Sequence, residues 1–149
     1  MTAEFAGIER RLDELSDRLV RLKPLIDRPR IEVHKDPYLR DGIERNLEVS
    51  ARCCIDISHR IISIEGARKP IDDYDATLSM GGLGVLQADF ARQLAPVAGF
   101  PNALVHECVA VDWGEVYKAV HRLEDLERSV RSVRRWLASR ASSSEDPDY

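Results

Sequence analysis

The sequence predicts an all-α protein, an up-and-down helical bundle of four main helices with short helical pieces. Three observations support this fold class. Apolar residues recur at three- and four-residue steps over long stretches, which is the spacing of one face of an α-helix. Aromatic residues make up only 6% of the chain, and no stretch alternates polar and apolar residues as a half-buried strand does. A length of 149 residues suits one domain with its own core.

The first helix is predicted by apolar residues at helical spacing: Phe5, Ile8, Leu12, Leu15, Leu19 and Leu22. We expect Pro24 to end this helix, because proline lacks the backbone donor that another turn needs. The stretch from Arg28 to Pro37 contains two prolines, which bias the residues before them away from helix. An extended connector is therefore expected there.

A second helix is expected from Tyr38 to Ile64, where one polar residue, Ser50, interrupts the apolar spacing: Ile43, Leu47, Ser50, Cys54, Ile57, Ile61 and Ile64. Gly66 suits the end of this helix, since glycine readily takes the left-handed conformation. A short helix is expected from Asp72 to Met80, followed by a flexible corner from Gly81 to Gly84. No strand precedes these glycines and no lysine follows directly, so we do not expect them to hold a nucleotide.

The next helix is predicted from Val85 to Ala98, and Gly99-Phe100-Pro101 interrupts it. Proline suits the first position of a helix. We therefore expect a second helical piece to begin near Pro101 and to run through His106.

The last helix is predicted to start with a capping box, Asp112 with Glu115 three residues later. Its apolar positions are Val116, Val120, Leu123, Leu126, Val130, Val133 and Leu137. The segment from Ala141 to Tyr149 is rich in serine and acidic residues and offers little to bury. We expect it to be a disordered acidic tail after a single domain of residues 1–140.

The candidate functional residues are Asn102 and His106, a polar pair within an otherwise apolar segment. Residues four apart on a helix share a face, so the two side chains would project together. Histidine suits proton transfer near neutral pH, and Asn102 can orient the imidazole or donate to a phosphate oxygen. Each residue also has a structural interpretation, as a packed histidine and as a helix-capping asparagine.

Two blocks, Glu44 to Ile62 and Gly99 to Asp112, resemble the second helix and the catalytic segment of HepT-like proteins in the HEPN superfamily. Asn102, His106 and Glu107 match the family motif. The resemblance implies an all-helical homodimer in which two such segments form one cleft. It also implies a metal-independent endoribonuclease without a cofactor, with His106 and Asn102 as catalytic residues and a nucleotidyltransferase antitoxin as partner.

Two positions depart from the family motif. Pro101 stands where the family has its catalytic arginine, and Cys108 stands where it has a tyrosine. Losing a cation of this kind costs on the order of a hundred- to a thousandfold in rate, by analogy with removal of one oxyanion donor. Arg45, Arg60 and Arg92 are the candidate substitute cations, although each also suits a solvated or packing role. In resembling systems the tyrosine is adenylylated by the antitoxin, and cysteine is not an equivalent acceptor.

Composition and charge exclude several other classes of protein. A net charge of −4 argues against a generally basic surface, so DNA is not expected and any contact with RNA must be local. The chain has three cysteines, an odd number, and lacks the paired ligand clusters of a zinc site, so we expect reduced thiols and no metal. No apolar run approaches the length of a membrane span, and we expect a cytoplasmic protein.

Two functional hypotheses of different class follow. The first is a HepT-like ribonuclease toxin of a toxin–antitoxin pair, with activity weakened by the changes in its motif. The alternative is a non-catalytic helical dimer that serves as an interaction module for a nucleotidyltransferase partner.

Overall fold

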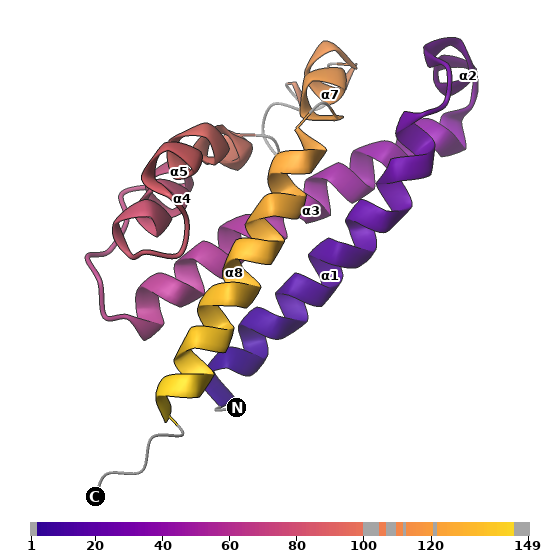
Figure 1. Cartoon of the computed structure of the whole chain (residues 1–149). Helices are drawn as coiled ribbons and strands as arrows, with labels where there is room; N and C mark the ends of the chain where they lie inside the picture. Colours follow the sequence, from indigo (N-terminus) through magenta and orange to yellow (C-terminus); the bar gives the residue numbers. More distant parts are fainter. Residues whose placement is uncertain (1–2, 100–104, 107–109, 112, 121, 145–149) are drawn as a thin grey trace, which may run out of the picture.

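Three long helices form the body of the protein (Figure 1). The computed structural model describes residues 3–99, 105–106, 110–111, 113–120 and 122–144. Helices α1 (Ala3–Ile26) and α3 (Pro37–Ile64) run side by side in opposite directions, and α8 (Leu123–Ser144) packs on both. The predicted all-helical bundle is confirmed.

The predicted apolar stripes form the core of this bundle. One continuous cluster joins α1, α3 and α8, and it also includes residues of the shorter helices. Its members on the long helices include Ile8, Leu12, Leu15, Leu19, Leu22, Ile43, Leu47, Cys54, Ile57, Ile61, Leu126, Val130, Val133 and Leu137. Because each long helix buries one face in this core, its other face is left to charged residues in contact with solvent.

A second layer covers the C-terminal half of α3. It consists of α4 (Asp73–Gly82), α5 (Ala88–Leu94) and the 3-10 helix η1 (Ala95–Gly99). The Asp72 side chain caps α4 by accepting a hydrogen bond of 2.7 Å from the backbone N–H of Asp75. Gly84 has a φ of +74° in the turn between α4 and α5, a conformation that favours glycine.

The connector between α1 and α3 differs from the sequence prediction. Helix α1 continues two residues beyond Pro24, where the missing N–H costs one hydrogen bond in the last turn. Helix α2 (Arg30–Lys35) then occupies the stretch that we expected to be extended. Pro29 precedes this helix, and burial of Val33 against the core stabilises it.

The last predicted helix is divided in two. Helix α7 (Trp113–Val120) ends before a turn at Arg122, whose guanidinium donates a hydrogen bond of 3.0 Å to the carbonyl oxygen of Gln93. Helix α8 starts at Leu123 and extends to Ser144, so the first four residues of the expected tail are helical. Residues 145–149 lie outside the described residues. Apart from these four helical residues, the division into one domain of residues 1–140 and a disordered tail remains a prediction.

A pair of two-residue strands replaces the helical piece that we expected to run through His106. Strand β1 (Val105–His106) pairs with β2 (Ala110–Val111) in an antiparallel register, with Val105 opposite Val111 and His106 opposite Ala110. The predicted helical piece was therefore wrong at Val105 and His106, the part of it that the structure describes. Valines favour an extended backbone, and pairing of the two strands satisfies backbone groups that a helix would satisfy locally.

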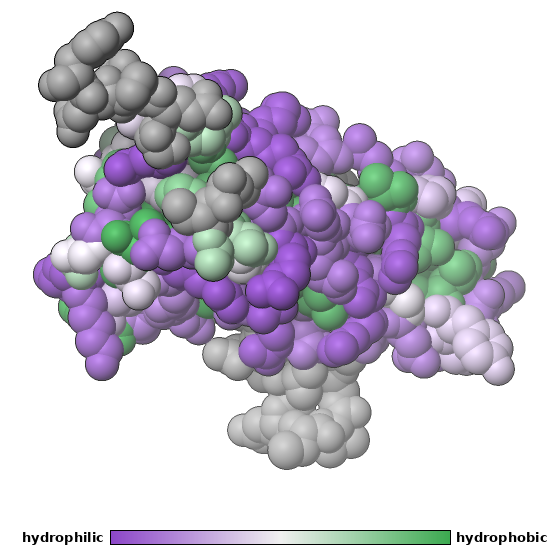
Figure 2. Space-filling view, turned by 90° about the horizontal axis from the view of Figure 1, so that it is seen from below, coloured by the Kyte–Doolittle hydropathy of each residue, from purple (hydrophilic) through white to green (hydrophobic). Residues whose placement is uncertain are grey.

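The molecular surface is mostly hydrophilic on the face that Figure 2 shows, and the hydrophobic residues there form separate groups. Large exposed apolar residues among those described include Val20, Ile31, Tyr38 and Ile71. No described helix combines the length and apolar character that crossing a membrane requires. The homodimer remains a prediction.

Candidate functional site

The described part of the predicted catalytic segment is the strand pair, which precedes α7 in the chain. His106 is the second residue of β1, and for this residue the structure describes the backbone. Pro101, Asn102 and Cys108 lie outside the described residues. The side-by-side arrangement of Asn102 and His106 on one helix face does not hold, because His106 belongs to a strand.

Helix α7 begins two residues after β2, and its aromatic residues contact His34 of α2. The imidazole of His34 lies edge-on to the rings of Trp113 and Tyr117, with centroids 5.9 and 6.1 Å away. The guanidinium of Arg30 lies 4.1 Å from the centre of the Tyr117 ring. We call Arg30, His34, Trp113 and Tyr117 the α7 cluster. It joins α2 to the helix that follows the strand pair.

The α7 cluster combines a cation with stacking surfaces. Guanidinium groups over aromatic rings are held in place by the charge distribution of the ring, and they keep their donors for other groups. Arg40 orders the same region by donating a hydrogen bond of 2.9 Å to the backbone oxygen of His34. Sequence reasoning missed this cluster because it treated the segment around His34 as an extended connector. Two arginines flanking the helix-breaking Pro29 were the available signal.

Arg30 also lines a cavity of about 100 Å³ between the end of α1, α2, α3 and α7. Val33, Ile43 and Val116 contribute its apolar walls, and Tyr117 lines it as well. The Tyr117 hydroxyl is buried and has no hydrogen-bond partner among the residues that the structure describes. A buried polar atom without a partner is uncommon and destabilises the folded state.

The three arginines suggested as substitute cations are engaged elsewhere. Arg45 forms an ion pair of 3.7 Å with Glu48 on the surface of α3, and Arg92 pairs with Asp89 on α5. The Arg60 guanidinium lies against Gly7 near the start of α1, so a β-carbon at position 7 would displace the end of the Arg60 side chain. The N-terminal end of α1 lies at the opposite end of the bundle from α7 (Figure 1).

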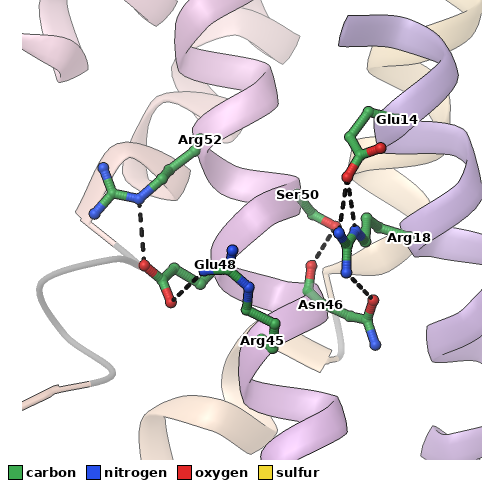
Figure 3. A network of polar contacts seen from close by, with 7 residues as sticks. All are labelled: Glu14, Arg18, Arg45, Asn46, Glu48, Ser50 and Arg52. Atoms are coloured by element: carbon green, nitrogen blue, oxygen red, sulfur yellow. Dashed lines mark hydrogen bonds and ion pairs between the residues drawn. The ribbon is translucent and has the colours of Figure 1, made fainter.

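A partly buried polar network connects α1 to the part of α3 that lies in the first of the two resembling blocks (Figure 3). The Arg18 guanidinium donates 3.1 Å to the Asn46 side-chain oxygen and also pairs with Glu14 at 2.8 Å. The Asn46 amide donates 2.7 Å to the Gly42 carbonyl, and the Ser50 hydroxyl donates 2.6 Å to the Asn46 carbonyl. Because the side-chain oxygen of Asn46 accepts one of these bonds and its side-chain nitrogen donates another, the role of Asn46 in the folded chain is structural.

The two described cysteines are not suited to act as nucleophiles or as metal ligands. Cys53 and Cys54 are buried and form no disulfide. Burial raises the pKa of the Cys53 thiol to about 11 and that of the Cys54 thiol to about 12, so both are protonated at neutral pH. Within the described part of the chain, no group of three or more His, Cys, Asp or Glu side chains could hold a metal ion.

Comparison with known proteins decides the family. The model of the family described as "Ribonuclease HepT-like" matches residues 15–133, which include α3, the strand pair, α7 and the first half of α8. The chain belongs to the HepT-like ribonuclease family. The HepT-like chain is 30% identical to the tRNA nuclease HepT of Aphanizomenon flos-aquae (strain 2012/KM1/D3) over 95 residues. The match covers 63% of the chain and 65% of that relative.

Solved structures share the fold of the HepT-like chain. One is the tri-AMPylated HEPN toxin of Shewanella oneidensis in complex with MNT antitoxin, with a TM-score of 0.75 and 20% identity. The similarity covers 90% of the HepT-like chain and 98% of that toxin chain. Another is a mutant of the toxin–antitoxin MntA-HpeT, with a TM-score of 0.76, 20% identity, and coverage of 87% and 98%. The helical arrangement therefore recurs in HEPN toxins.

Proposed function

We propose that this HepT-like chain is a metal-independent endoribonuclease and the toxin of a toxin–antitoxin pair. The observation that carries the proposal is the family match over residues 15–133, since this range includes His106 and the fold around it. The similar chain from Aphanizomenon is a tRNA nuclease, and the similar folds are toxins in complex with antitoxin. RNA is the proposed substrate and the cytoplasm the proposed location.

His106 is the proposed proton-transfer residue. Its imidazole would take the proton of a ribose 2′-hydroxyl as that oxygen attacks phosphorus, or deliver a proton to the leaving oxygen. Asn102 would orient the imidazole or bind a phosphate oxygen. In a homodimer two such segments form one cleft, so one histidine can act as the base and the other as the acid.

The cation that meets the developing negative charge is the weak point of the site. Pro101 has no donor to offer. Arg45, Arg60 and Arg92 are engaged in the contacts described above, whereas Arg30 lies on Tyr117 of the helix that directly follows the strand pair. We rank Arg30 first as the substitute, and we expect activity below that of a site with the motif arginine.

The proposed partner is a nucleotidyltransferase antitoxin that neutralises the toxin by binding. The similar toxin from Shewanella is tri-AMPylated and was solved with MNT antitoxin. Cys108 replaces the tyrosine that accepts adenylyl groups in resembling systems, so we expect a stable complex in which the Cys108 region stays unmodified. Mass spectrometry after incubation with the antitoxin and ATP tests this point, and an adenylyl group on that peptide would contradict it.

The test of activity is incubation of the purified protein with labelled RNA in the presence of EDTA. Cleavage should persist in EDTA and should disappear in His106→Ala. A matched control is His59→Ala, which removes an exposed histidine that pairs with Asp73 at 2.8 Å on another part of the bundle. Cleavage that is equal in His106→Ala and in the wild type would refute the proposed site.

The alternative function is a non-catalytic helical dimer that binds the nucleotidyltransferase as an interaction module. Pro101 in place of the motif arginine is the observation that favours it. Antitoxin binding without any RNA cleavage, in the wild type and in Pro101→Arg alike, would support this alternative.

A further inference from the structure

A groove of about 590 Å³ lies between α8 and the turn that joins α4 to α5. Arg128, Arg131 and Arg135 line one wall. The turn from Gly84 to Gln87 lines the other wall. No acidic side chain contributes to the groove among the residues that the structure describes. In a chain with a net charge of −4, a groove with three arginines is a local concentration of positive charge.

The arginines follow one side of α8. They are three and four residues apart, so their backbones are separated by about 4.5 and 6 Å along the helix axis. The stretch from Arg128 to Arg140 contains five arginines and no acidic residue. Arg134 pairs with Asp13, and Arg140 pairs with Glu65, outside the groove.

The three groove arginines keep their charge available. Arg128 is positioned by a hydrogen bond of 3.1 Å to the Gln87 side-chain oxygen and by the Phe90 ring, 4.0 Å from its guanidinium carbon. Neither contact neutralises it. Arg131 and Arg135 have no ion-pair or hydrogen-bond partner among the described residues.

The groove suits a chain of phosphates better than a protein surface. Its apolar residues Leu86, Phe90 and Trp136 are buried, so it lacks the exposed aromatic or aliphatic anchors around which protein interfaces form. A second copy bound about a twofold axis at this groove would place arginines against arginines. The backbone N–H groups of Gly84, Val85 and Leu86 are already bonded within the turn, so binding would depend on the arginines.

We propose that this groove binds the phosphate backbone of the RNA substrate. The groove begins at Arg128, about 7.5 Å along α8 from Leu123, and it extends away from α7 and the strand pair that carries His106. RNA bound there leaves the catalytic end of the bundle along α8. This inference rests on the proposed ribonuclease function and adds the surface that holds the substrate outside the cleft.

The test compares two double variants with the same loss of charge on the same helix. Arg131→Gln/Arg135→Gln removes the two groove arginines without a described partner. Arg134→Gln/Arg140→Gln is the matched control outside the groove. Binding of a fluorescein-labelled single-stranded RNA is measured by anisotropy over a salt series, with His106→Ala in every protein so that the RNA stays intact.

Each phosphate contact on a single strand contributes about 0.7 to the slope of the logarithm of the binding constant against the logarithm of the salt concentration. Loss of two contacts should therefore make this slope smaller by about 1.4, and over the decade from 1 M to 0.1 M salt this difference corresponds to about 25-fold weaker binding by the groove variant at 0.1 M. The control should keep the slope of the parent protein. Equal slopes for the two double variants, or no RNA binding by the parent, would overturn the inference.

Two further measurements separate this inference from other outcomes. RNA cleavage is also measured for each double variant with His106 intact. Absence of cleavage in the parent protein would contradict the proposed function, whereas cleavage that is equal in the parent and the groove variant would contradict only the role of the groove. If the groove variant binds RNA normally but loses a nucleotidyltransferase antitoxin, the groove is a protein-binding surface and the inference is wrong.

Discussion

Replacing Asn46 with alanine tests whether the Arg18–Asn46 contact holds α1 to α3. Asn46 is 7% exposed, and its side-chain oxygen accepts the 3.1 Å hydrogen bond from Arg18. The substitution leaves a guanidinium N–H without this acceptor between two packed helices (Figure 3). Arg18 also loses part of its fixed position, although its ion pair with Glu14 remains.

The expected cost follows from these contacts. A hydrogen bond to a charged group contributes about 1.5–3 kcal/mol, and alanine returns about 0.5 kcal/mol because it favours helix more than asparagine does. The bond from the Asn46 amide to the Gly42 carbonyl is lost as well, but it lies within one helix and that carbonyl keeps its place in the backbone ladder. We therefore expect the free energy of unfolding to fall by about 1–2.5 kcal/mol.

The assay is urea unfolding at fixed protein concentration, since a dimer would make stability depend on concentration. A double-mutant cycle with Arg18→Met isolates the pair, and we expect a coupling energy of about 1–2 kcal/mol. The matched control is the exposed pair of Glu48 and Arg52, 3.3 Å apart on α3 alone, where about 0.3–0.5 kcal/mol is expected. Equal coupling energies for the two pairs would refute the assignment.

Three other predictions concern titration and activity. Burial raises the thiol pKa to about 11 for Cys53 and to about 12 for Cys54. Iodoacetamide at pH 8 should therefore alkylate both thiols in the folded protein at least about a hundredfold more slowly than in the urea-unfolded protein. Mass spectrometry of the Cys108→Ser protein measures these rates, and equal rates in the two states would contradict the prediction. Burial raises the pKa of Glu44, so its stabilising contribution is present below the pKa of the unfolded chain and is lost as pH rises through the folded value. Glu44→Gln should therefore raise the urea midpoint at pH 7 relative to the wild type and lose this advantage near pH 4; an unchanged midpoint at pH 7 would argue against it. Pro101→Arg should raise the RNA cleavage rate by about a hundred- to a thousandfold, and no increase would show that the missing cation does not limit catalysis.

The fold class and the three long helices could be predicted from the amino-acid sequence alone. The leucines of α1 and the isoleucines of α3 recur at helical spacing over many turns, so local periodicity was enough to predict which face is buried. The residues that resemble the family motif were enough to predict the family, and the family match over residues 15–133 confirmed it.

The breaks in these helices were decided by tertiary structure. The apolar stripe continues through Val120 and Leu123, yet the chain turns at Arg122, whose guanidinium donates a hydrogen bond to the Gln93 carbonyl oxygen on another helix. Helix α2 forms in a proline-flanked stretch because Val33 is buried there. Periodicity carries no information on such distant partners, so neither the turn nor α2 was predicted.

The polar surfaces likewise depend on residues far apart in the sequence. Arg30 meets Tyr117, Arg18 meets Asn46, and the α8 arginines face the turn at Gly84 only after the helices pack. A sequence gives the charge and size of each side chain, but its neighbours, and hence its available hydrogen bonds, are fixed by packing. The motif could therefore be recognised from the sequence, whereas the groove and the α7 cluster required the fold.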